Sequence, residues 1–188
     1  MESRERLLAA GLRMFVDRGY DAVGVQEIVS ESGVTKPSLY HHFGNKAGLL
    51  DELALRVDER LFAEIDGATV YARDLPCSLE LLADAFLSFA ARWPAEARLL
   101  LAAQNGPVES ATRQALSGVW NRLISEVARL FAAASEDHGN MRGRADEYTV
   151  AFLGAVCAYM VRSLDGNLPD EPSLAHRIMR QFSYGIYT

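Results

Sequence analysis

The residues between 116 and 131 show the pattern that most limits how this 188-residue chain can fold. Their apolar members recur every three or four positions, and they are Leu116, Val119, Trp120, Leu123, Ile124, Val127, Leu130 and Phe131. This spacing places them on one wide face of an α-helix, which must be buried against other elements. No stretch of the sequence alternates apolar and polar residues as a half-buried strand does. The sequence therefore predicts an all-α fold.

Similar spacing divides the rest of the chain into helices, about nine in all. Gly19 is placed to end the first of them, and Asn45 is placed to cap a long helix further on. We expect Ser78 to cap the next helix, and we expect that helix to stop before Pro94 because proline disfavours helix in the preceding residue. The last helix carries an apolar stripe of Leu174, Ile178, Phe182 and Ile186.

Charge is distributed unevenly along the chain. The net charge is −6, yet residues 1–46 carry six basic and six acidic side chains, so the excess of acid lies in the remainder. The two lysines of the chain, Lys36 and Lys46, both fall in this neutral part. A surface that binds a polyanion must therefore be local and lie in the N-terminal quarter.

Neither a membrane segment nor a secretion signal is recognisable. The first six residues are rich in charge, and no long apolar run follows them. The longest uncharged apolar run, Thr149–Val161, has 13 residues, whereas a helix that spans a bilayer needs roughly 20. We therefore expect a soluble protein of the cytoplasm.

Residues 25–43 combine two short helices with a tight turn. Ile28 and Val29 make one side of the first helix apolar, and Gly33 suits the left-handed turn that follows. Leu39 and Phe43, four residues apart, face inward from the second helix and leave it a polar outer face. This arrangement is a helix-turn-helix.

A polar helix behind such a turn suits the major groove of DNA. Residues near its N-terminus can reach base edges, and its first N–H groups favour phosphate. Lys36 stands at that end, with Tyr40 and His41 one turn further on. Lys46, at the start of the next helix, can hold the adjacent phosphate. Both lysines therefore stand where a cation is useful beside a polyanion.

With "TKPSLYHHFGNKAGLL" preceded by "VQEIVSESGV", the chain resembles the DNA-binding domain of the tetracycline-repressor (TetR) family over about residues 4–55. Members of that family are dimeric bacterial regulators with three N-terminal helices for DNA and a larger helical ligand-binding domain. The resemblance implies a DNA-binding domain over residues 1–46 and a ligand-binding and dimerisation domain over 47–188. It also implies a ligand-responsive regulator, in the simplest case a repressor that leaves a palindromic operator when a small molecule binds.

The resemblance also implies, position by position, which side chains contact DNA. These are Gln26, Thr35, Lys36, Pro37, Ser38, Tyr40, His41, His42 and Lys46. Many members of the family have a hydroxyl residue where this chain has Gly24 and Val25. The first helix of the motif therefore lacks a hydroxyl cap and one phosphate donor at its start.

For the ligand pocket, the candidates are large side chains on the helices of the second domain. They are Phe62, Phe86, Phe89, Trp93, Trp120, Phe152, Tyr159 and Met160. Few charges lie near these residues in sequence, which favours an apolar or weakly polar effector.

The resemblance places the interface of a homodimer on the last two helices. Small residues form one stripe of a helix whose other faces are also apolar, and such a helix must be covered on all sides. The candidates for the interface are Ala151, Gly154, Ala155, Ala158, Ile178 and Phe182.

Other classes of protein fit the sequence less well. An enzyme needs a converging set of catalytic groups, and none is recognisable. His41 and His42 point about 100° apart on a helix and have no further ligands nearby, so we expect neither a metal nor a cofactor. An architectural DNA binder would be strongly basic. The remaining alternative is a helical small-molecule-binding protein, or an activator, whose DNA binding is secondary.

Overall fold

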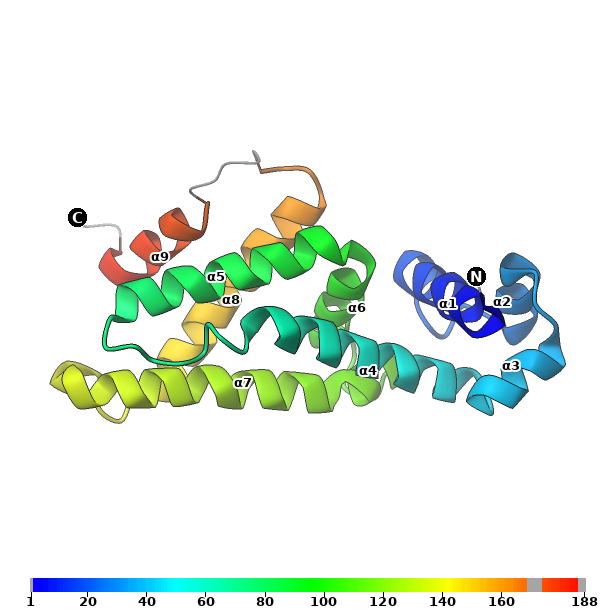
Figure 1. The fold of residues 1–188 in the computed structure, drawn as a ribbon, viewed down its shortest axis with the longest axis horizontal. Helices are drawn as coiled ribbons and strands as arrows, with labels where there is room; N and C mark the ends of the chain where they lie inside the picture. Colours follow the sequence, from blue (N-terminus) through cyan, green and yellow to red (C-terminus); the bar gives the residue numbers. More distant parts are fainter. Residues whose placement is uncertain (1, 169–173, 186–188) are drawn as a thin grey trace. The chain divides into compact units, whose positions relative to one another are not determined.

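The computed structural model describes residues 2–168 and 174–185, which form nine α-helices and no strand (Figure 1). The helices are α1 (Ser3–Arg18), α2 (Val25–Ser32), α3 (Lys36–Phe43), α4 (Lys46–Ile65), α5 (Leu75–Arg92), α6 (Pro94–Asn105), α7 (Ala111–Asp137), α8 (Ala145–Leu164) and α9 (Leu174–Tyr184), with a short 3-10 helix, η1 (Gly139–Met141). The all-α prediction is therefore confirmed. None of the described helices is long and apolar enough to cross a bilayer. Ile186, predicted on the last apolar stripe, lies outside the described residues.

Contacts between residues divide the chain into two compact units. The first unit comprises Met1–Glu59 and Ala95–Val119, and the second comprises Arg60–Pro94 and Trp120–Thr188. α4 and α7 each contribute residues to both units. The first part of α4 packs with the helices before it, and the domain boundary predicted after residue 46 stays a prediction.

In the first unit, α1, α2 and α3 pack against one another. Leu7, Leu8 and Ile28 are fully buried there, as is Leu49 from the beginning of α4. A Cβ atom on Gly11 of α1 would lie only 2.5 Å from a methyl carbon of Leu49. The absence of a side chain at that position of α1 therefore lets α4 pack closely on it.

Two sequence features set the ends of the helices in the first unit. Gly33 has φ 60° and ψ 30°, the left-handed conformation that glycine adopts without strain, and it ends α2 as predicted. The side chain of Asn45 accepts a hydrogen bond from the backbone N–H of Gly48 at 2.8 Å, which confirms its predicted role as a cap of α4. The turn into α3 and the start of α4 are therefore fixed locally.

In the second unit, α5 contacts α8 and α9, which also contact each other. The rings of three phenylalanines meet in its interior, with centroid distances of 6.2 Å between Phe131 and Phe152, 6.0 Å between Phe131 and Phe182, and 5.4 Å between Phe152 and Phe182. Phe86 and Phe89 of α5 are also almost fully buried. Aromatic packing therefore joins α7, α8 and α9 in one core.

The prediction that Ser78 caps α5 was wrong, because the helix begins at Leu75. Asp74 is the cap, and its carboxylate accepts a hydrogen bond from the backbone N–H of Cys77 at 3.0 Å. Ser78 is buried, and its Oγ donates to the carbonyl of Asp74 at 2.8 Å. Aspartate and serine are both good caps, and Pro76 is tolerated in the first turn of a helix. The helix ends before Pro94, as predicted.

Gly48→Ala is expected to lower the free energy of unfolding by about 1–3 kcal/mol. Its Cβ would lie 2.0 Å from the carbonyl oxygen of Phe43, a backbone atom that cannot turn aside. Gly118→Ala is the matched control, because a Cβ atom at this position of α7 meets open space. There alanine should raise the free energy of unfolding by about 0.5–1 kcal/mol. Urea unfolding of both variants checks the prediction, and equal stabilities would contradict it.

Candidate nucleic-acid interface

α3 turns most of its side chains outward. Leu39 is the buried residue of this helix, with 0% of its surface exposed. The other side of the helix is largely exposed. Its exposed residues are Thr35, Lys36, Pro37, Tyr40, His41 and His42, and Ser38 is half-buried. The Tyr40 ring is 45% exposed, which is unusual for a large aromatic side chain in a folded domain. The face predicted to contact DNA is therefore accessible.

Lys36 presents a cation beside an aromatic ring. Its Nζ lies 6.0 Å from the centroid of the Tyr40 ring. Among the ion pairs of the described residues none involves Lys36, whereas Arg13 and Arg18 of α1 each pair with a glutamate. An exposed ammonium without a carboxylate partner is available to phosphate oxygens or to the acceptors of guanine.

The start of α2 is stabilised by a side chain within the helix. The carboxylate of Glu27 accepts a hydrogen bond from the Gly24 N–H at 2.8 Å and pairs with Arg18 at 2.6 Å. The Gly24 hydrogen bond and the Arg18 guanidinium lower the pKa of Glu27 below 4.5. Glu27 thus compensates for the missing hydroxyl cap and leaves Gln26 exposed beside it. This contact was not predicted, although a glutamate three residues after a helix start is a recognised signal.

Lys46 is half-buried and ties the start of α4 to the loop before α2. Its Nζ donates to the carbonyls of Tyr20 and Val23, both at 3.0 Å, and lies 4.0 Å from the centroid of the Tyr20 ring. The two carbonyls stand 26 and 23 positions earlier in the chain, so sequence spacing could not indicate this role. An ammonium has three N–H donors, so one of them remains for a phosphate oxygen. The contact of Lys46 with DNA phosphate stays a prediction.

Charged side chains form a second tie between α1 and α4. Arg4 pairs with Glu52 and with its neighbour Glu5, and Arg56 also pairs with Glu5. The hydrogen bond from Arg56 is the main reason why the pKa of Glu5 lies below its ordinary value. The beginning of α4 is therefore held to the helices before it both by packing and by charge.

The two adjacent histidines of α3 contact each other. The centroids of the His41 and His42 rings are 5.3 Å apart in an edge-to-face arrangement. Within residues 2–168 and 174–185, no group of three or more His, Cys, Asp or Glu side chains could hold a metal ion. Both imidazoles are exposed, as Tyr40 is.

The predicted pocket residues of the second unit are mostly part of its core. Six of the eight are at most 6% exposed, namely Phe62, Phe86, Phe89, Trp120, Phe152 and Met160. Trp93 and Tyr159 are half-buried, and the guanidinium of Arg60 covers the Trp93 ring at 3.7 Å. Other residues, including Phe131, Tyr148 and Phe182, line a hollow of about 730 Å³. The composition of the pocket stays a prediction.

The predicted interface residues fall into two groups. On α8, Ala151, Gly154 and Ala158 are exposed, and Ala155 is half-buried. On α9, Ile178 is 1% exposed, and the Phe182 ring is half-buried and packs on Phe152. The composition of the interface stays a prediction.

The arrangement of α2, a glycine turn and α3 with an exposed polar face defines a helix-turn-helix protein. Residues 7–53 match the sequence profile of the bacterial regulatory proteins of the tetR family. The N-terminal part of this chain is a DNA-binding domain of the tetR family, and the resemblance predicted from the sequence is confirmed.

Curated relatives match the chain over part of their length. It is 38% identical over 88 residues to the transcriptional activator FasR of Mycolicibacterium smegmatis, a match that covers 47% of this chain and 40% of FasR. It is 40% identical over 60 residues to the transcriptional repressor KstR2 of Mycobacterium tuberculosis, which covers 32% of this chain and 30% of KstR2. The chain thus spans less than half the length of these relatives, both of which are transcriptional regulators.

The fold is also similar to that of solved regulators along almost the whole chain. The transcriptional regulator FadR of Bacillus subtilis, in complex with stearoyl-CoA, matches with a TM-score of 0.75 and 14% identity. The match covers 97% of this chain and 99% of FadR. At 14% sequence identity, the similarity to FadR establishes the fold alone.

Lys46→Met is expected to lower the free energy of unfolding by about 1–3 kcal/mol, because it removes two charge-assisted hydrogen bonds from a half-buried site. Lys36→Met is the matched control, since its side chain is exposed, and it should change stability by less than about 0.5 kcal/mol. Chemical unfolding of the two variants measures the difference. Equal effects would mean that the Lys46 contacts do not hold the loop.

Glu27 should titrate below 4.5 because its ionised form accepts the Gly24 N–H and pairs with Arg18. A carboxyl group whose pKa is lowered by folding stabilises the folded state at pH values above its ordinary pKa. This contribution is lost as the pH falls through the pKa of the folded state. NMR titration of the Glu27 carboxyl carbon measures the midpoint. Arg18→Gln should move it up towards 4.5. An unchanged midpoint in that variant would contradict the assigned cause.

Proposed function

We propose that this chain is a ligand-responsive, sequence-specific DNA-binding regulator that works as a homodimer in the cytoplasm. Each protomer places α3 in the major groove of one half of an inverted-repeat operator. Lys36, Tyr40 and His41 lie towards the bases, and Thr35 and Lys46 lie towards the phosphates. A small molecule bound in the C-terminal helices lowers the affinity for the operator.

The observation that carries this proposal is the outer face of α3. It combines an ammonium without a carboxylate partner among the described residues, Lys36, with the exposed ring of Tyr40. Both belong to a domain that matches the tetR family. A net charge of −6 disfavours general attraction to DNA, so we expect a few directed contacts per protomer to supply the affinity.

An exposed apolar face on α8 supports the homodimer. Val150 is 72% exposed and Val161 is 40% exposed, with Gly154 and Ala158 exposed between them. These positions recur every three or four residues, so they share one face of the helix. Such a face needs cover, and its small residues allow a second helix to approach closely. Two-fold symmetry then requires an inverted repeat in the operator.

α4 is the element through which an effector would act. It runs without a break from Lys46 to Ile65 and contributes to both units, and its first part is tied to α1 and to the loop before α2. A ligand changes operator affinity only if it binds two conformations unequally. The complex of FadR with stearoyl-CoA supports an effector that has a large apolar part.

Repression is the simpler outcome, because a dimer bound across a promoter excludes the polymerase. KstR2 is a repressor and FasR is an activator, so the direction of regulation needs its own test. Transcription in vitro from a promoter that overlaps the operator should fall when the protein is added. A rise in transcript would favour the alternative, an activator.

Selection of bound duplexes from a random DNA pool should recover one inverted repeat. In fluorescence anisotropy with that duplex, the double variant Lys36→Ala, Tyr40→Ala should lose at least about 100-fold in affinity, since both contacts disappear from both half-sites. The variant Val70→Ala, Arg129→Ala is the matched control, because it removes an exposed apolar residue and a cation in the second unit, and it should bind as the wild type does. Recovery of no preferred sequence, or equal binding by the two double variants, would contradict the proposal.

A further inference from the structure

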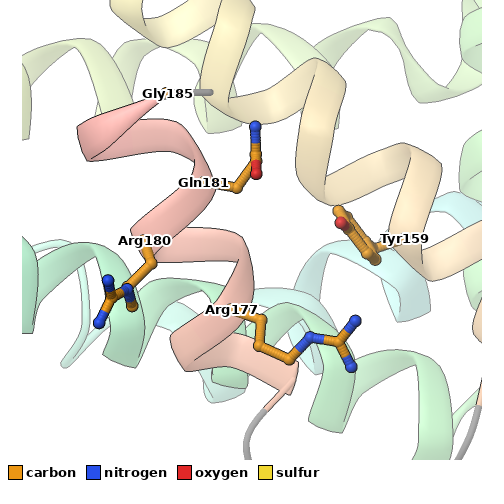
Figure 2. A pocket seen from close by; sticks show the side chains of 5 residues that line it. All are labelled: Tyr159, Arg177, Arg180, Gln181 and Gly185. Carbon is orange, nitrogen blue, oxygen red and sulfur yellow. The ribbon is translucent and has the colours of Figure 1, made fainter. Parts of the chain in front are cut away.

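Two hollows of the second unit meet at the seam between α8 and α9. The larger has a volume of about 730 Å³ and draws its lining from α5, α7, η1, α8 and α9. The smaller, of about 280 Å³, is lined by Tyr159, Arg177, Arg180, Gln181 and Gly185 (Figure 2). Gln181 lines both hollows, so they adjoin.

The larger hollow is apolar with a neutral polar rim. Its apolar wall includes Leu79, Phe131 and Met141, and the Phe131 ring packs on Tyr148 with centroids 5.7 Å apart. The lining residues with polar groups are His138, Asn140, Tyr148, Gln181, Ser183 and Tyr184. None of the described residues that line it is Asp, Glu, Lys or Arg. Its volume lies in the range of small-molecule sites, roughly 300–1,000 Å³. This hollow suits the apolar part of a ligand.

The smaller hollow is cationic. Figure 2 shows the guanidinium of Arg177 reaching from α9 towards Tyr159 of α8, with the amide of Gln181 directed to the same side. A guanidinium has five N–H donors, so a contact within the chain leaves donors for a ligand. None of the described residues that line this hollow is acidic. These donors suit a carboxylate or a phosphate.

One face of α8 runs from one hollow to the other. Tyr148 and Ala151 line the larger hollow, Tyr159 lines the smaller one, and their spacing with Ala155 between them places all four on the same face. The rise from Ala151 to Tyr159 is about 12 Å, the length of a medium alkyl chain. An elongated ligand can therefore reach both hollows.

This seam is distinct from the exposed apolar face of α8 that carries Val150, Gly154, Ala158 and Val161. The two sets of positions interleave along the sequence and form neighbouring faces of the helix, because Ala151 of the seam and Ala158 of the exposed face are seven residues apart. A second copy of the chain on the exposed face would therefore lie beside the seam.

We propose that the α8–α9 seam binds an amphipathic anion, with its apolar chain in the larger hollow and its acidic group held by Arg177, Tyr159 and Gln181. The inference rests on the proposed function in treating this molecule as the effector. The sequence favours a weakly polar effector because few charges lie near the aromatic residues along the chain. Arg177 and Tyr159 line the same hollow only because α9 packs on α8.

Fluorescence titration of the full chain with 11-(dansylamino)undecanoic acid and with its methyl ester tests the site. The wild type should bind the acid at least about tenfold more tightly than the ester, because only the acid carries the anion that Arg177 holds. Arg177→Gln should lower the affinity for the acid about tenfold and leave the affinity for the ester unchanged. Ser183→Phe should lower the affinity for both compounds by about tenfold, since the ring of the new phenylalanine fills part of the larger hollow.

Two matched variants control for general effects. Arg129→Gln removes an exposed cation of α7, and Ser117→Phe adds a ring to an exposed position of α7 outside both hollows. Neither should change the binding of the acid or the ester. Circular dichroism and thermal unfolding of every variant confirm that it is folded.

Several results would overturn the inference. They are no binding of the acid to the wild type, equal binding of acid and ester, or an Arg177→Gln variant that binds both as the wild type does. A Ser183→Phe variant that binds normally but sediments as a monomer would show that a second copy of the chain occupies the seam.

Operator release separates the failure of this inference from the failure of the proposed function. If the acid binds as expected but never releases the selected duplex, the seam is a binding site and the proposed ligand response is wrong. If the acid releases the duplex equally from the wild type and from Arg177→Gln, the response stands and the effector site lies elsewhere.

Discussion

The burial of Leu39 decides how the first unit can work. α3 has eight residues, and a helix of that length is not stable alone in water. It persists because Leu39 is fully buried in a helix that packs on α1 and α2. With that side chain inside and Gly33 fixing the turn before the helix, Lys36 and Tyr40 must face outward. The orientation of the proposed DNA-reading face therefore follows from one buried leucine and one left-handed glycine.

The second constraint is the attachment of α4 to the helices before it. Leu49 packs against the bare backbone of Gly11, Lys46 donates to two carbonyls of the loop before α2, and Arg4 pairs with Glu52. These contacts join the beginning of α4 to the helices that carry α3. A displacement of α4 would consequently be passed to α3, which is what an effector in the C-terminal helices requires.

Local sequence signals predicted much of this structure. Apolar spacing located the helices, and Gly33, Asn45 and Pro94 marked boundaries that the structure has. The roles that could not be predicted depend on residues brought together by the fold. Lys46 meets carbonyls more than twenty positions away, and the Phe131, Phe152 and Phe182 rings share one core. The cap of α5 was misplaced because Asp74 and Ser78 are both suitable residues and sequence alone does not rank them.

The most direct test of the central claim is methylation protection of guanine N7 in the selected operator, because N7 lies in the major groove. We expect two protected patches centred about 10 base pairs apart, or a multiple of that spacing, one for each α3 of a dimer. Protection should disappear in the variant Lys36→Ala, Tyr40→Ala. No protection of guanine N7, a single unpaired patch, or protection that persists in that variant would show that α3 does not read the operator.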